Sequence, residues 1–156
     1  KTKTKNILIE IISALIIFLF AYTGLSKLID HDSFENVLAR SPVTKYISGT
    51  VSWILPLAEV VVAILILIPR VRIKGLLFSL ILMCAFTAYI AGMLLFVSDL
   101  PCACGGIISR IGWLPHLIFN IFITLLNFMA WRLEKHDKLF IAKTGIAEYL
   151  YKKVGD

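Results

Sequence analysis

Two cysteines that stand one residue apart are the most reactive pair of side chains in this sequence. Cys102 and Cys104 lie in the stretch "DLPCACGGIISR", residues 99–110, and a glycine pair follows them. A disulfide between them closes a very small ring, which needs a restricted backbone shape and adds little stability through loop entropy. A strained, exposed disulfide exchanges easily, which favours a redox-active pair. Two other interpretations stay open: ligands for a soft metal ion such as Cu(I), and free thiols in a turn.

Ionisable and amide side chains inside apolar stretches form a second group of candidates. Glu59 interrupts one apolar run, and Lys27 lies near the end of another, within reach of that carboxylate. His116 and Asn120 are four residues apart and therefore share one face of a helix. Ionisable groups in a bilayer are functional hypotheses by default. The alternative is structural, because polar side chains also join packed membrane helices.

These groups suggest specific chemistry beside the thiols. Glu59 is a candidate proton donor or acceptor. Three roles are open for His116: favouring the thiolate form of a cysteine, relaying a proton, or bonding a quinone carbonyl. Tyr22 and Tyr89 add polar groups to two other apolar stretches, and from the residues alone we interpret them as packing positions. No spacing of His or Cys specifies a zinc site, so we assign no residue as a metal ligand.

The elements that must position these side chains are long apolar stretches. The chain has 156 residues, 59% of them hydrophobic, which is more than a soluble domain of this size carries. Each of four stretches is long enough to cross a bilayer as a helix: residues 7–29, 50–68, 75–97 and 111–131. The first is too long for the apolar core of a signal peptide, and we interpret it as a retained span. The sequence therefore predicts an all-α integral membrane protein.

Two domains follow from these spans: a four-helix membrane bundle in residues 1–131 and a tail in residues 132–156. Amphipathic patterns mark two segments outside the spans. Phe34, Val37 and Leu38 have helical spacing, which predicts a short outer helix that ends before Pro42. The tail mixes apolar residues with lysines, and we expect it to lie on the cytoplasmic membrane surface or to dock a partner.

The distribution of Lys and Arg predicts the orientation. Twelve of these residues lie on the side that holds both termini and the link between the second and third spans, and four lie on the other side. The positive-inside rule places the richer side in the cytoplasm. In a bacterial inner membrane, both termini are then cytoplasmic and Cys102 and Cys104 face the periplasm, where disulfides persist. This orientation also explains the net charge of +6. Nucleic acid is not an expected partner, because the chain carries no nucleic-acid-binding motif.

Four stretches of the chain resemble a known family: "AYTGLSKLIDHDSFENVLARSP", "ILPLAEVVVAILIL", "FTAYI" and "PCACGGIISRIGWLPHLIFN". They look like the MauE branch of the DoxX-like, redox-associated membrane proteins in its Bacteroidetes form, over residues 15–130. MauE is associated with maturation of methylamine dehydrogenase, a disulfide-rich enzyme, beside a thioredoxin-like partner. The resemblance implies a four-helix bundle with a periplasmic cysteine motif. Its motif residues here are Tyr22, Lys27, Glu59, Tyr89, Cys102, Cys104, His116 and Asn120.

The general layout is also similar to that of the quinone-coupled oxidases of disulfide formation, DsbB and the vitamin K epoxide reductases. This similarity makes a quinone the candidate cofactor, with Asn120, Tyr22, Lys27 and Tyr89 as candidate lining residues for the quinone or for a proton relay. Those enzymes have further cysteines, whereas this chain has one extracytoplasmic pair.

The sequence thus predicts an inner-membrane thiol–disulfide component, a candidate oxidoreductase. Cys102 or Cys104 exchanges with a disulfide of a periplasmic thioredoxin-like protein during maturation of exported proteins, and His116 and Glu59 assist proton movement. Two rival hypotheses stay open. One is a non-catalytic accessory subunit of a larger membrane complex, and the other is a membrane protein that binds a soft metal ion.

Overall fold

The fold is known from a computed structural model that describes residues 2–96 and 113–154, with side chains described for residues 4–95 and 114–136. Cys102 and Cys104 lie outside the described residues. The described parts of the chain contain helices and no strand. In chain order the helices are α1 (Thr2–Ile29), α2 (His31–Arg40), α3 (Ser48–Leu67), α4 (Arg72–Phe96) and α5 (Trp113–Val154).

Four of these helices contain segments that are long and apolar enough to cross a membrane: Thr4–Ile29, Ser48–Leu67, Arg72–Leu95 and Leu114–His136. They coincide with the four predicted spans, apart from shifts of a few residues at the ends. The prediction of an all-α membrane protein with a four-helix bundle is therefore confirmed. Large apolar side chains such as Phe18, Ile54 and Leu125 are exposed on the outside of the bundle. Lipid chains solvate such surfaces, so lipid contact follows from this arrangement.

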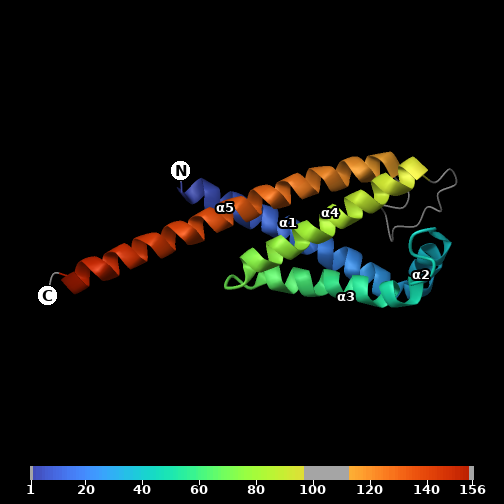
Figure 1. Ribbon diagram of the computed structural model, residues 1–156, viewed down its shortest axis with the longest axis horizontal. Helices are drawn as coiled ribbons and strands as arrows, with labels where there is room; N and C mark the ends of the chain where they lie inside the picture. Colours follow the sequence, from blue (N-terminus) through green and yellow to red (C-terminus); the bar gives the residue numbers. More distant parts are fainter. Residues whose placement is uncertain (1, 97–112, 155–156) are drawn as a thin grey trace.

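The helices pack in an antiparallel arrangement that brings one set of ends together. α1 packs mainly on α3, and α4 packs mainly on α5, while α3 also contacts α4 and α1 also contacts α5. α2 lies against α3 at the end where α1 stops, α3 and α5 begin, and α4 stops (Figure 1). We call this the α2 end. The turn between α3 and α4 lies at the opposite end.

The short helix α2 matches the predicted outer amphipathic helix. Phe34 and Leu38 are buried, and the helix ends at Arg40. Ser41 is already extended, with φ −76° and ψ 131°, as expected for a residue that precedes a proline. The apolar face of α2 therefore covers the end of the bundle.

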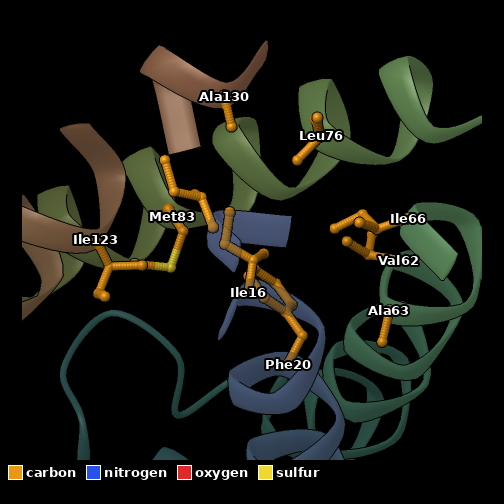
Figure 2. Packing of buried hydrophobic residues seen from close by; sticks show 10 residues of the cluster. Ile16, Phe20, Val62, Ala63, Ile66, Leu76, Met83, Ile123 and Ala130 are labelled. Atoms are coloured by element: carbon orange, nitrogen blue, oxygen red, sulfur yellow. The ribbon is translucent and has the colours of Figure 1, made fainter. Parts of the chain in front are cut away.

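The apolar core lies in the middle of the bundle and toward the opposite end. Ile16 of α1, Ile66 of α3 and Leu76 of α4 are fully buried, and they belong to one apolar cluster with Met83 and Ile123 (Figure 2). Phe20 and Met83 belong to this core, and both also line the cavity described below. The packed core is therefore the floor of that cavity. The remaining cysteine, Cys84, lies within α4, and its side chain is exposed on the outside of the bundle.

The last helix is longer than its membrane span. α5 continues as one helix to Val154, and its C-terminal part projects beyond the bundle (red in Figure 1). The predicted tail thus continues the fourth span as helix. Its expected position on the cytoplasmic membrane surface stays a prediction.

Candidate functional site

A buried ion pair joins α1 to α3 near the α2 end. The ammonium group of Lys27 contacts Oε1 of Glu59, and the two side chains are 12% and 1% exposed. The same ammonium group lies 5.5 Å from the ring centre of Phe34 and 5.2 Å from that of Phe86. Both distances are within the range of a cation–π interaction. Lys27 therefore contacts one residue from each of α2, α3 and α4.

The two helices come close enough for this contact because a glycine stands at their crossing. A Cβ atom on Gly24 would lie 3.0 Å from the carbonyl oxygen of Pro56 and 3.2 Å from Cβ of Glu59. Pro56 is buried inside α3, where it cannot donate a backbone hydrogen bond. Gly24 precedes Lys27 by three residues, so both lie on the face of α1 that meets α3. The absence of a side chain at Gly24 thus lets the two helices approach closely enough for the ion pair to form.

The ion pair borders a cavity of about 280 Å³ in the α2 end. Its wall is mostly apolar, with contributions from all five helices. Its lining residues include the aromatic residues Phe34, Phe86 and Phe119 and the methionines Met83 and Met93. The polar lining residues are Thr23, Lys27, Ser41, Thr44, Glu59, Tyr89, His116 and Asn120.

Hydrogen bonds attach the segment after α2 to the wall of the cavity. The hydroxyl group of Tyr89 donates to Oγ of the buried Ser41 at 3.0 Å, and the hydroxyl group of Thr44 donates to the carbonyl oxygen of Leu38 at 2.8 Å. Oγ of Ser41 lies 3.7 Å from the sulfur of Met93. These contacts hold the cover formed by α2 against α4.

Five of the residues predicted from the sequence meet in this cavity: Lys27, Glu59, Tyr89, His116 and Asn120. They come from α1, α3, α4 and α5, so the fold brings together side chains that are distant in the sequence. Tyr22 lies apart from them. It is exposed on α1, and its ring stacks on that of Phe18 with 6.2 Å between the ring centres.

The candidate residues Cys102 and Cys104 belong to the segment that joins α4 to α5. The structure describes α4 as far as Phe96 and α5 from Trp113 onward. Both of these helices line the cavity, and both reach the α2 end. Within the described parts of the chain, no group of three His, Cys, Asp or Glu side chains lies close enough together to hold a metal ion.

Sequence reasoning missed several residues of this site. Phe34 was interpreted only as part of the apolar face of α2, and Ser41 only as a helix end, although both line the cavity. Phe86 had no signal of its own in the sequence. The helical spacing of Phe34, Val37 and Leu38 was the one indication in the sequence that this segment belongs to the site, because the apolar face of a helix must pack against another part of the protein.

Fold and site together define a class: a helical membrane protein with four candidate spans, a short helix that covers one end of the bundle, and a cavity beside a buried ion pair. The family comparison then identifies the chain more closely. A model of the family described as "Methylamine utilisation protein MauE" matches residues 5–133, and the chain belongs to this family. The predicted MauE resemblance is thereby confirmed, while its DoxX-like and Bacteroidetes aspects stay predictions. No curated protein and no solved structure matches the chain.

Proposed function

We propose that this MauE-family protein is an inner-membrane thiol–disulfide component with Cys102 and Cys104 as its reactive pair. The observation that carries the proposal is topological. The two helices joined by the cysteine-bearing segment, α4 and α5, both line the cavity that holds the ion pair, Tyr89 and His116. By the positive-inside rule, this end of the bundle faces the periplasm and both termini are cytoplasmic. Disulfides persist in that compartment.

The proposed reaction is thiol–disulfide exchange with a thioredoxin-like protein. The thiolate of one cysteine attacks the disulfide of the partner, which forms a mixed disulfide and releases one partner thiolate. The second cysteine then attacks the mixed disulfide. The products are a Cys102–Cys104 disulfide and a partner dithiol, so two electrons pass to the partner. In the opposite direction the same bonds form and break in reverse order.

Protons must move in each of these steps, because a thiol loses a proton to attack and a leaving thiolate gains one. His116 is suited to this role, since it lies in the first turn of α5, close in sequence to the cysteine segment, and lines the cavity. Glu59 lies on the same cavity and extends the set of groups that exchange protons. We propose these two residues as proton acceptors and donors for the thiols.

A trapping experiment tests the proposal. In a Cys84→Ser background the pair supplies the only thiols of the chain. A single Cys102→Ser or Cys104→Ser substitution there removes the resolving thiol, so we expect a mixed disulfide with a periplasmic thioredoxin-like protein to accumulate. Mass spectrometry of the trapped species identifies the partner. The matched control, Cys102→Ser with Cys104→Ser and Cys84 retained, should trap nothing.

One observation favours the rival role of accessory subunit. α5 continues as a helix to Val154, beyond the span that ends at His136, and such a helix suits contact with another subunit. The Cys102→Ser/Cys104→Ser variant separates the two functions. If it supports normal maturation of disulfide-containing periplasmic proteins while loss of the whole protein abolishes it, the protein is an accessory subunit and the redox proposal is wrong.

A further inference from the structure

The carboxylate of Glu59 uses only one of its two oxygen atoms. Oε1 contacts Lys27, whereas Oε2 is buried and has no hydrogen-bond partner among the described residues. The nearby hydroxyl group of Thr23 does not supply one, because it donates to the carbonyl oxygen of Leu19 at 2.9 Å. The whole side chain is 1% exposed and lines the cavity. Buried polar atoms are nearly always hydrogen-bonded in native proteins. An unpaired carboxylate oxygen on a residue that lines the cavity is therefore a candidate acceptor for a hydrogen bond from a bound molecule.

The charges of the site indicate a neutral ligand. Lys27 and Glu59 form one ion pair, and the ammonium group already faces Oε1 and the rings of Phe34 and Phe86. A charged ligand in this largely apolar cavity would lack a counter-charge, and burying an unpaired charge is costly. A neutral molecule carries no such cost.

The shape and wall of the cavity indicate an aromatic body. Several aromatic residues and two methionines line it, and aromatic rings pack well against other rings and against methionine side chains. Its volume of about 280 Å³ is near the lower limit of the ligand pockets found in proteins, about 300 Å³. This size suits a molecule of one or two rings, or the ring end of a longer one.

The remaining requirement is the donor. An ion-paired carboxylate oxygen only accepts hydrogen bonds, so a ligand that has only carbonyl oxygens would leave Oε2 unpaired. A hydroxyl group on the ring would donate to it. The amide of Asn120, 6% exposed, lies on the same cavity and offers both a donor and an acceptor to a second polar group of the ligand.

We propose that the cavity binds a neutral aromatic molecule whose hydroxyl group donates a hydrogen bond to Oε2 of Glu59. This inference does not depend on the cysteine chemistry, because every residue that carries it lies on the described helices. The same requirement distinguishes the two redox forms of a quinone. The reduced form has hydroxyl groups that can donate a hydrogen bond to Oε2, whereas the oxidised form has only carbonyl oxygens, which cannot donate.

Two probes of nearly equal size test the donor requirement. 2-Naphthol carries the hydroxyl group, and 2-methoxynaphthalene replaces it with an ether that cannot donate. Isothermal titration calorimetry of the full chain in detergent gives both dissociation constants. A hydrogen bond to a charged acceptor is among the stronger ones, so we expect 2-naphthol to bind about tenfold more tightly. Equal affinities, or no binding of 2-naphthol, would overturn the proposal.

Variants place the binding in the cavity. The double variant Lys27→Met/Glu59→Leu removes both charges together, and we expect the preference for 2-naphthol to fall from about tenfold to about onefold. An unchanged preference contradicts the proposal. Because both affinities are measured on the same variant, a general change in packing does not alter their ratio.

A filled cavity gives an independent check. Leu55 lines the cavity, and its neighbour Ile54 is 61% exposed on the lipid-facing side. Leu55→Trp should abolish binding of both probes, whereas Ile54→Trp should leave it unchanged. Equal binding by these two variants would exclude this cavity as the site. The Cys102→Ser/Cys104→Ser variant should bind 2-naphthol like the wild type, so failure of the redox proposal is distinguishable from failure of this one.

Discussion

Two ion pairs fix α1 to neighbouring helices at opposite ends of the bundle, and they differ in their surroundings. Lys27 and Glu59 join α1 to α3 at the α2 end, with the carboxylate 1% exposed. Arg72 and Glu10 join α4 to α1 at the opposite end, with 2.8 Å between Nη1 and Oε1 and with Glu10 65% exposed. The first pair is almost completely buried, whereas the carboxylate of the second pair is largely exposed to solvent.

The packing around the two pairs differs in the same way. Toward the opposite end, Ile66 and Leu76 are fully buried, and a Cβ atom on Gly75 would lie only 2.7 Å from the backbone nitrogen of Ile66. At the α2 end the helices leave a cavity, and polar side chains converge on it. The bundle is thus closely packed at one end, whereas the other end contains a cavity with polar side chains in its wall.

Removing one partner of each ion pair should give the largest difference in stability between the two ends. Lys27→Met leaves the carboxylate of Glu59 buried without a counter-charge, and we expect a loss of about 3–5 kcal/mol in the free energy of unfolding. Arg72→Met leaves Glu10 in contact with solvent and should cost less than about 1 kcal/mol. Unfolding in mixed micelles with increasing SDS measures both values.

The double variant Lys27→Met/Glu59→Leu controls for loss of the side chains themselves. It removes both charges, so most of the lost stability should return. If the double variant is as unstable as Lys27→Met, an uncompensated charge is not the cause, and the contrast between the two ends does not rest on electrostatics.

The glycines offer a second, smaller contrast. Gly24→Ala places a methyl group 3.0 Å from the carbonyl oxygen of Pro56, so α1 must move away from α3. We expect a loss of about 1–3 kcal/mol. Gly92→Ala is the matched control in another helix, because no packing neighbour among the described residues lies within 4 Å of its new methyl group. It should change stability by less than about 0.5 kcal/mol.

The same unfolding assay in mixed micelles compares the two glycine variants. Similar stabilities for Gly24→Ala and Gly92→Ala would show that α1 and α3 are farther apart at their crossing than they are in this structure. A weaker preference for 2-naphthol in Gly24→Ala is also expected, since Lys27 moves with α1.

The sequence was sufficient for the spans and for the polar groups inside them. Apolar runs of sufficient length predicted the four membrane-spanning helices, and the helical spacing of Phe34 and Leu38 predicted α2. Glu59 and Lys27 were recognisable as partners because an ionisable group inside a membrane needs one. These predictions succeeded because they depend on local patterns and on the cost of burying charge.

The details that failed depend on how each helix is rotated. Successive residues of a helix point about 100° apart, so Thr23 lines the cavity while its neighbour Tyr22 faces outward. The hydrogen bond from Tyr89 to Ser41 joins residues far apart in the chain. A single sequence does not specify such rotations and long-range contacts, because they depend on packing of all the helices at once.

Two polar contacts give the finest test of the contrast between the ends. In the packed interior, Nδ2 of the fully buried Asn127 donates to Oγ of Ser79 at 2.7 Å. Ser79→Ala leaves that amide without this partner, and we expect a loss of about 1 kcal/mol. Beside the cavity, Tyr89→Phe removes the bond to Ser41, whose Oγ still accepts from the backbone N–H of Val43 at 3.4 Å. This change should cost less than about 0.5 kcal/mol. Paired unfolding curves decide the order, and a larger loss for Tyr89→Phe would mean that the cover over the cavity, rather than the packed interior, limits the stability of the bundle.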